Sequence, residues 1–222
     1  MRILILTCSL IFLASCTIGS KTTPSSVSGE SVKSLISSDK YSPALQKTIP
    51  SPTFGSGKRN LTIYADFQCP ACIAFSDALG GAFEAYAASG KTTITYKQFP
   101  LTSIHPNAYR DAIAGLCVAE QGKYMDGKKA LYNLERAKAG AKVTDAERVS
   151  ALAAIGADAT ELTQCLSENR YAKQVDDEVV AGDAVGVSGT PTVFLDGTKM
   201  ELGIIFADPV KGQAFLDRVF SE

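Results

Sequence analysis

Two cysteines three positions apart, Cys69 and Cys72, are the residues of this sequence whose spacing points most directly to chemistry. A compact, β-prone apolar run at 61–65 precedes them, and helical apolar spacing follows them. Such a pair is expected at a strand-to-helix turn, where unpaired N–H groups and the positive end of the helix dipole favour the thiolate of the first cysteine. Because the thiolate is the species that attacks a disulfide, the spacing predicts thiol–disulfide exchange. Cys69 is the predicted nucleophile, and Cys72 is the predicted resolving thiol.

The same spacing is compatible with half of a zinc site or with a purely structural disulfide. A zinc site needs a second cysteine pair, whereas Cys117 and Cys165 stand alone and His105 is the only histidine. The sequence therefore predicts no metal site and no other cofactor. A structural disulfide remains the alternative use of Cys69 and Cys72.

Cys117 and Cys165 both fall in a long helical block, on segments that have an apolar face. We interpret them as a structural disulfide between two helices of this block. The alternative is a pair of buried free thiols, which behave as small apolar residues.

Charge excludes some classes of partner. The 22 Lys and Arg residues balance 23 Asp and Glu residues, for a formal net charge of −1. This balance gives neither the excess of positive charge that is typical of nucleic-acid-binding proteins nor a polybasic patch for anionic lipid. The sequence therefore predicts no nucleic-acid partner.

Two further ionisable residues are candidates for the site. Asp66, the nearest carboxylate before the cysteines, either assists proton transfer to Cys72 or is a turn residue at the surface. His105 is interpreted as a packing or capping residue, with a part in the active site as the alternative, because thiol exchange runs without a histidine.

The rest of the chain alternates strand and helix signals. Strands are expected at 61–65, 93–99 and 191–195, with a short hairpin partner near 199–202, and a last helix begins at 208–209. From about 107 to 180 the sequence is helical throughout, with capping-box spacing at 144–147 and 158–161. Pro191 opens a strand after a turn that contains Gly189, which is a favourable position for a cis peptide bond.

With these motifs in this order, the sequence resembles the thioredoxin superfamily and, within it, the DsbA-like oxidoreductases with an inserted helical region. The matching residues are 66–72, 99–101, 104–108, 117–124 and 189–192, within 59–222. The resemblance implies an α/β, thioredoxin-like fold: a central mixed sheet of four to five strands, flanked by helices, with an inserted α-helical domain. It also implies that Thr190 and Pro191 face the reactive disulfide and bind substrate backbone, together with Pro70 and Ala71.

Two departures from the family pattern bear on the direction of catalysis. Strong oxidases commonly have a histidine between the two cysteines, where this chain has Ala71. The substitution removes a cation and a hydrogen-bond donor, so Cys69 is expected to be less acidic than in those enzymes. Many members also carry an acidic residue six positions before the first cysteine, where this chain has Ile63.

The N-terminus has the features of an export signal. After Met1 and Arg2, an apolar run at 3–13 is too short to cross a bilayer, which takes about 20 residues of helix. It leads into Leu13-Ala14-Ser15-Cys16, which resembles the lipobox of bacterial lipoproteins and implies lipidation of Cys16. The alternative is an ordinary signal peptide in which Cys16 has no special role. The expected protein is exported and anchored to a membrane by lipid, facing the periplasm or the cell exterior.

Five regions follow from these features. They are a lipoprotein signal peptide at 1–15, a polar tether and leading segment at 16–58, a first thioredoxin-like part at 59–103, an inserted helical domain at 104–180, and a second thioredoxin-like part at 181–222.

The predicted function is an oxidase that introduces disulfides into envelope or secreted proteins by exchange at Cys69 and Cys72. Its predicted partners are unfolded or partly folded, cysteine-containing exported proteins and a membrane redox partner that the sequence does not identify. The alternatives are a disulfide isomerase or reductase of the same fold, a client-specific thiol enzyme of envelope or cytochrome assembly, and an anchored, non-enzymatic binding module with a static disulfide.

Overall fold

The computed structural model describes residues 42–203 and 209–220. The chain divides into Met1–Ser38, which lies outside the described residues, and a second, compact unit, Asp39–Glu222. The predicted signal peptide at 1–15, the lipidation residue Cys16 and the first part of the tether therefore also lie outside the described residues.

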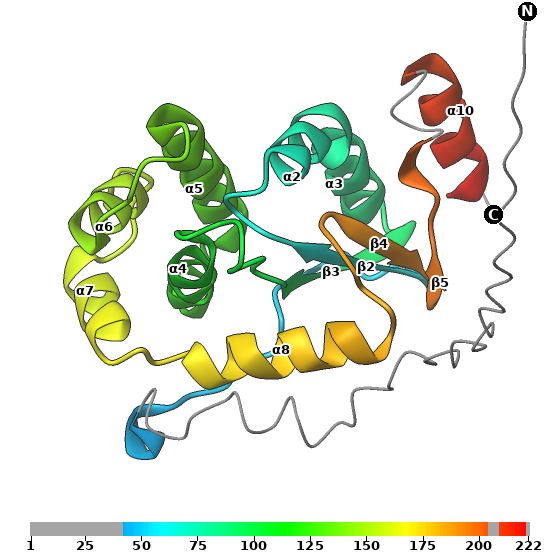
Figure 1. Ribbon diagram of the computed structural model, residues 1–222. Helices are drawn as coiled ribbons and strands as arrows, with labels where there is room; N and C mark the ends of the chain where they lie inside the picture. The colour runs from blue at the N-terminus through cyan, green and yellow to red at the C-terminus, as the bar shows by residue number, and fades with distance from the viewer. Residues whose placement is uncertain (1–41, 204–208, 221–222) are drawn as a thin grey trace, which may run out of the picture. The chain divides into compact units, whose positions relative to one another are not determined.

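A five-stranded mixed sheet forms the centre of the second unit, in the spatial order β1-β3-β2-β4-β5 (Figure 1). The strands are β1 (Thr53–Phe54), β2 (Arg59–Ala65), β3 (Thr92–Gln98), β4 (Thr192–Leu195) and β5 (Thr198–Lys199). β2 and β3 are parallel, and the other neighbouring strands are antiparallel. The runs predicted as strands at 61–65, 93–99 and 191–195 coincide with β2, β3 and β4, whereas β1 was not predicted.

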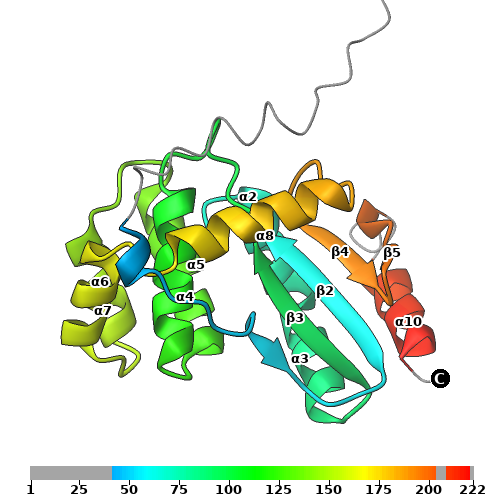
Figure 2. The ribbon, with the colours of Figure 1, turned by 90° about the horizontal axis from the view of Figure 1, so that it is seen from below.

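Helices cover both faces of this sheet. Figure 1 shows α2 (Pro70–Phe75) and α3 (Gly81–Ala88) on one face and α8 (Ala172–Ala184) on the other, and Figure 2 shows α8 lying across the strands. A π-helical turn, η3 (Ser76–Gly80), lies between α2 and α3. α10 (Pro209–Val219) places Leu216 in the core.

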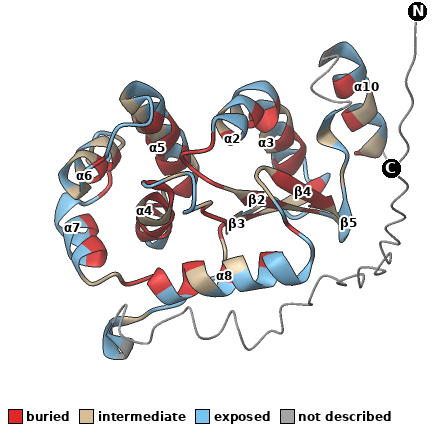
Figure 3. Ribbon diagram, in the orientation of Figure 1, coloured by how far each residue is buried: buried red, intermediate tan, exposed pale blue. Residues whose placement is uncertain are grey.

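Between β3 and α8 lies a block of four helices. They are α4 (Ala108–Glu120), α5 (Tyr124–Lys138), α6 (Asp145–Ala153) and α7 (Ala159–Ser167). Thr144 closes a reciprocal capping box at the start of α6, and Asp158 caps α7 by accepting hydrogen bonds from backbone N–H groups. The buried residues of these helices face one another (Figure 3). The predicted α/β fold with an inserted helical region is therefore confirmed.

Cys117 on α4 and Cys165 on α7 are joined by a disulfide. Both side chains are buried, and the bond links two helices of the inserted block, which is the first of the two interpretations that the sequence allowed.

The described part of the leading segment, residues 42–58, contacts the folded unit. It forms a 3-10 turn at Pro43–Leu45 and then β1, which pairs with β3. The backbone N–H of Ile49 donates to Gln174 Oε1 on α8 at 3.0 Å. These contacts attach residues 43–54 to the folded unit.

No helix in the described part of the chain is both long and apolar enough to cross a membrane.

Candidate active site

Three chain segments meet at one edge of the sheet because of how the strands pair. β2 and β3 run parallel, so the residues that follow both strands, from Asp66 and from Phe99, leave the sheet at the same edge. β4 runs antiparallel to β2, with Tyr64 opposite Thr192, so the residues just before β4 lie there too. The cysteine turn, the loop at 99–107 and the turn before Pro191 are therefore brought together.

The two cysteines occupy different positions in the first turn of α2. Cys69 is the N-cap residue and Pro70 follows it at the first helical position, where its missing N–H leaves no intrahelical bond unmade. Both thiols are free, and their exposed fractions are 6% for Cys69 and 1% for Cys72. Since Pro70 and Ala71 between them are exposed, a partner can reach Cys69 more readily than Cys72.

The surroundings shift the pKa values of the two thiols in opposite directions. A hydrogen bond from Cys72 is the largest effect on Cys69 and lowers its pKa from 9.0 to about 5. The Thr190 side chain and the backbone N–H groups of Ala71 and Cys72 lower it further, against the effect of burial. Burial is the main reason that the pKa of Cys72 is raised well above its ordinary value. In the reduced chain, Cys69 is thus the thiolate at neutral pH and Cys72 holds the proton.

The turn before β4 contributes the opposite side of the site. The Thr190–Pro191 peptide bond is cis. The Cys69 thiol lies 3.3 Å from the backbone oxygen of Thr190. Thr192 Oγ1 donates to the Gly189 oxygen at 2.8 Å, which holds the turn in place. The structure thus brings together Cys69, Thr190 and Pro191.

Asp66 is buried and directs its carboxylate to the loop after β3. Oδ1 accepts from the backbone N–H of Gln68 at 2.8 Å, and Oδ2 accepts from that of Leu101 at 2.9 Å. Oδ2 also forms a 2.7 Å hydrogen bond with Nδ1 of His105. Cys72 instead meets the backbone of this residue, since the Asp66 N–H lies 3.5 Å from Cys72 Sγ. The carboxylate therefore joins the cysteine turn to the loop, and the interpretation of Asp66 as a surface turn residue is wrong because its side chain is fully buried.

The hydrogen bond between Asp66 and His105 was not predicted from the sequence. The two residues are 39 positions apart, and no local pattern connects them. The signal that could have suggested it is the topology, because parallel strands place the residues that follow them at a common edge.

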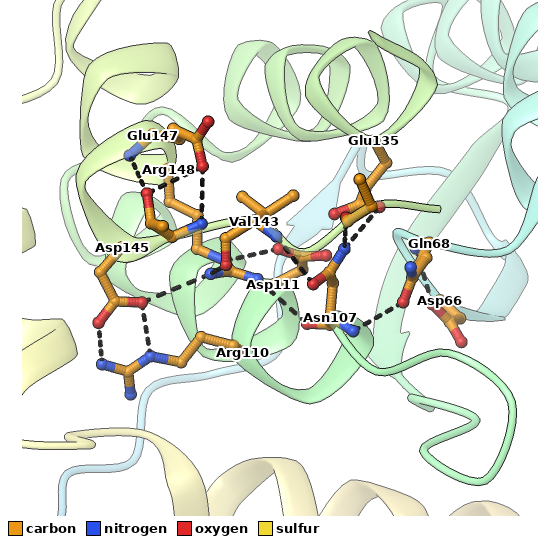
Figure 4. Close-up of polar contacts among 12 residues, drawn as sticks. Asp66, Gln68, Asn107, Arg110, Asp111, Glu135, Val143, Asp145, Glu147 and Arg148 are labelled. Atoms are coloured by element: carbon orange, nitrogen blue, oxygen red, sulfur yellow. Dashed lines mark hydrogen bonds and ion pairs between the residues drawn. The ribbon is translucent and has the colours of Figure 1, made fainter. Parts of the chain in front are cut away.

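A buried polar network connects the cysteine turn to the inserted helices (Figure 4). The Asn107 N–H donates to Gln68 Oε1 at 2.7 Å, and its side-chain amide donates to Glu135 Oε2 on α5 at 3.2 Å. Arg148 on α6 donates to Asp111 Oδ1 on α4 at 2.7 Å. Because Gln68 immediately precedes Cys69, the position of the reactive turn depends on this network.

Asp111 and Glu135 are two acidic groups buried close together. Burial raises the pKa of Asp111 to about 8; the Arg148 guanidinium opposes this shift and the Glu135 carboxylate adds to it. Among the described residues, Asp111 Oδ2 and Glu135 Oε1 have no hydrogen-bond partner. A proton held between these two oxygens would satisfy both, so we expect Asp111 to be protonated at neutral pH.

Within residues 42–203 and 209–220, no group of three or more histidine, cysteine or acidic side chains is arranged to hold a metal ion.

Comparison with known proteins gives a family match and structural likenesses. A family model described as thioredoxin matches residues 52–208. The MdbA protein of Actinomyces oris, a thiol-disulfide oxidoreductase, is 21% identical, with a TM-score of 0.60 over 68% of this chain and 80% of that one. The Chlamydia trachomatis DsbA structure is 20% identical, with a TM-score of 0.60 over 71% of this chain and 87% of that one. At these identities the two structures establish likeness of fold.

A curated relative of another kind also matches. The Na(+)/H(+) antiporter NhaA 3 of Salinispora tropica is 30% identical over 139 residues, which are 61% of this chain and 20% of the antiporter. The chain spans about a fifth of the length of the curated relatives that it matches.

Proposed function

The chain belongs to the thioredoxin family, and from this membership we propose that it is a thiol–disulfide oxidoreductase acting on cysteine-containing proteins. The observation that carries the proposal is the contrast between its two thiols. Cys69, whose pKa is lowered to about 5, lies beside the exposed residues Pro70 and Ala71, whereas Cys72 is buried and its pKa is raised. This contrast supports the proposed roles of Cys69 as the residue that joins a partner and of Cys72 as the resolving thiol.

We further propose that the chain works as an oxidase. A thiolate of the client attacks Sγ of Cys69 in the Cys69–Cys72 disulfide, and the electron pair of the broken bond leaves with Cys72, which takes up a proton. A second client thiolate then attacks the client sulfur bound to Cys69, and Cys69 leaves as a thiolate. The client gains one disulfide, and the chain gains the two electrons that the client loses.

The low pKa of Cys69 supports this direction. A stabilised thiolate is a good leaving group in the second step, and its stabilisation favours the reduced chain over the disulfide. The first effect speeds release of the oxidised client, and the second makes the disulfide form more oxidising. Isomerase or reductase activity is the alternative within the same chemistry, and a static disulfide in a binding module is the alternative outside it.

Thr190, Pro191, Pro70 and Ala71 are proposed to bind the client next to Cys69. Thr190 and Pro191 lie against the thiol, and the other two form the exposed surface of the helix turn. Asp66 is proposed as a positioning residue, because its carboxylate is engaged by the loop at 101–105.

The reduction potential of Cys69–Cys72, measured on the full chain in a glutathione titration, tests the direction of catalysis. We expect a value near that of strong oxidants, about −120 mV on a scale where thioredoxin lies at about −270 mV. A value near the thioredoxin end would favour the reductase or isomerase. A Cys69→Ser variant that still supports all activity of the chain would favour the binding module.

For location, we propose export and a lipid anchor on Cys16, with a membrane protein re-oxidising Cys69–Cys72. The apolar run at 3–13 and the sequence Leu13-Ala14-Ser15-Cys16 support this proposal. The proposed regions are a signal peptide at 1–15, a tether and leading segment at 16–58, and thioredoxin-like parts at 59–103 and 181–222 around helices at 104–180. Incorporation of labelled fatty acid into the chain, and its loss in Cys16→Ser, tests the anchor.

A further inference from the structure

His105 is the only histidine of the chain, and the exchange reaction proposed above leaves it unused. That reaction begins with a client thiolate, yet an ordinary cysteine thiol has a pKa of about 8.5 and is only about 3% ionised at pH 7. A group that accepts the proton of the client thiol beside Cys69 would therefore speed the first step. The surroundings of His105 decide whether it can be that group.

Asp66 joins His105 to both reactive cysteines through three different groups. Its carboxylate Oδ2 is hydrogen-bonded to Nδ1 of His105 at 2.7 Å. Its backbone oxygen accepts from the N–H of Cys69 at 3.2 Å, and its own N–H lies 3.5 Å from Sγ of Cys72. Because one residue makes all three contacts, the imidazole lies close to the disulfide that the client attacks.

The hydrogen bonds of Asp66 determine which nitrogen of His105 can accept a proton. Oδ1 accepts from the N–H of Gln68 and Oδ2 accepts from that of Leu101, which fits a carboxylate that acts only as an acceptor. Nδ1 of His105 is therefore assigned as the donor in its bond to Oδ2, and the neutral ring then has its free lone pair on Nε2. Among the described residues, no hydrogen bond to Nε2 is found.

The imidazole can be reached from the side on which a client approaches Cys69. The side chain of His105 is 14% exposed, whereas that of Asp66 is fully buried. His105 lines a surface cavity of about 500 Å³ together with Gln68 and Pro70, the residues on either side of Cys69. A thiol that approaches Cys69 from this cavity therefore meets the imidazole, while the carboxylate behind it is closed to solvent.

The other ionisable side chains that line this cavity have partners of their own. They are Asp77, Glu135 and Arg136. Asp77 and Arg136 pair with each other at 2.7 Å, and Glu135 is buried and hydrogen-bonded within the polar network of Figure 4. In the oxidised chain the two reactive cysteines carry no charge. Among the described residues, Asp66 is therefore the carboxylate placed to stabilise the positive charge that His105 gains when Nε2 takes up a proton.

We propose that Nε2 of His105 accepts the proton of the client thiol as the client sulfur attacks Sγ of Cys69, and that the Asp66 carboxylate stabilises the imidazolium that forms. The S–H bond of the client breaks, its sulfur bonds to Cys69, and the electron pair of the Cys69–Cys72 bond leaves with Cys72. His105 then gives its proton to water, and Cys72 takes one up from water. The inference rests on the proposed function and adds a catalytic residue to it.

Thiols of different acidity test this role. The rate at which the Cys69–Cys72 disulfide of the oxidised full chain opens is measured with glutathione, which is mostly protonated at pH 7, and with 4-mercaptophenylacetate, an aryl thiol that is mostly ionised there. His105→Asn retains a donor to Asp66 but has no basic nitrogen. It should lower the glutathione rate at pH 7 by about tenfold, within the limit of about 30-fold set by the ionised fraction, and the aryl thiol rate by about twofold or less. The glutathione deficit should disappear by about pH 9.5, where this thiol is itself ionised.

Ile104→Ala is the matched control, because Ile104 is an exposed neighbour of His105 in the same loop. It should keep the rates of the unmodified chain with both thiols. An equal effect of His105→Asn on the two thiols, or a deficit that persists at about pH 9.5, would mean that His105 only holds the loop in position, and the inference would be overturned.

A second variant, His105→Ala, leaves room for free imidazole beside Asp66. Added imidazole should restore its glutathione rate at pH 7 with saturation and leave the aryl thiol rate unchanged. Failure of the proposed function gives a different result, because a chain whose disulfide opens with neither thiol at any pH lacks the exchange chemistry itself. Full reactivity of His105→Asn and His105→Ala with both thiols at pH 7 overturns only the role of His105 and leaves the exchange chemistry intact.

Discussion

At the scale of the residue, the reactive pair works through an asymmetry between two chemically identical side chains. Hydrogen bonding from Cys72 and from backbone N–H groups lowers the pKa of Cys69 and outweighs the effect of its burial. Cys72 is buried without comparable compensation. Ala71 supplies no cation to Cys69, so the expectation that Cys69 is less acidic than in enzymes with a histidine at this position stays a prediction.

Titration of the Cys69 thiolate by its absorbance near 240 nm should show half-ionisation at about pH 5. Cys69→Ser should abolish this transition. Cys72→Ala removes the largest of the stabilising hydrogen bonds, so it should move the transition to higher pH, whereas Cys72→Ser retains a hydroxyl donor and should move it less. A transition near pH 9 in the unmodified chain would contradict the proposed role of Cys69.

The same shift makes the stability of the reduced chain depend on pH. The pKa of Cys69 is about 5 in the folded chain, below its ordinary value of 9.0. The unfolded chain therefore holds one more proton between these values, and stability rises with pH across the window. The contribution is complete above about pH 9 and is lost as the pH falls through about 5. Urea unfolding of reduced and oxidised chains should show a difference that grows with pH, since the oxidised chain has no Cys69 thiolate.

At the scale of the element, α4 sets the position of the cysteine turn by packing directly on it. A Cβ atom at Gly115 would lie 2.7 Å from Cε2 of the Phe67 ring, which is closer than real Cβ contacts allow. Phe67 is two residues before Cys69 and is itself buried. The glycine is therefore needed for the close approach of α4 to the turn.

Gly115→Ala should destabilise the fold by about 1–3 kcal/mol, because a rigid ring in a packed core must move to admit the methyl group. The matched control is Gly81→Ala on α3, where a Cβ would meet nothing within 4 Å. That variant should be neutral or more stable by up to about 1 kcal/mol, since alanine is the better helix former. Chemical denaturation of both variants measures the difference, and equal stabilities would argue against close packing at Phe67.

The helices of the inserted block also enclose the Asp111–Glu135 pair. The pKa of Asp111 is raised from 3.8 to about 8 in the folded chain, so the folded chain binds more protons than the unfolded chain between these values. Stability should therefore fall as the pH rises from about 4 to about 8, and then level off.

Asp111→Asn isolates this effect. The amide can still accept from Arg148 and can donate to Glu135, but it does not titrate. Relative to this variant, the unmodified chain should lose stability across the window, as urea unfolding at several pH values would show. Asp177→Asn, which removes an exposed carboxylate on α8 instead, is the matched control. A pH-independent difference between the chain and Asp111→Asn would mean that Asp111 is ionised throughout.

At the scale of the whole molecule, the inserted block is tied to itself and to the sheet by contacts between distant segments. The disulfide between Cys117 and Cys165 closes a loop with a sequence separation of 48. The polar contacts through Asn107 and Gln68 then connect this block to the reactive turn. Loosening of the inserted block should therefore alter the position of the cysteine pair.

Replacing both Cys117 and Cys165 by serine should lower the free energy of unfolding by about 4 kcal/mol in the chain-entropy model, because the unfolded chain regains the freedom of the closed loop. The comparison chain is Cys69→Ser/Cys72→Ser, which keeps this disulfide and removes the other pair. Denaturation under non-reducing conditions measures both. A midpoint unchanged by loss of the Cys117–Cys165 disulfide would show that the block is stabilised by packing alone.

The sequence by itself determined the features that local spacing encodes. The period of apolar residues marked β2, β3 and β4, capping residues marked the starts of α6 and α7, and the spacing of Cys69 and Cys72 marked the reactive turn. Each of these signals is local, because it depends on residues within one or two turns of helix or one strand.

Only the tertiary structure decided the features that depend on contacts between distant segments. β1 is two residues long and forms by pairing with β3, so it has no periodicity to recognise. The pairing of Asp66 with His105 and the burial of Asp111 beside Glu135 each join segments far apart in the chain. Such contacts arise where strand order and helix packing bring chain ends to one edge of the sheet, and no local pattern records which residues will meet there.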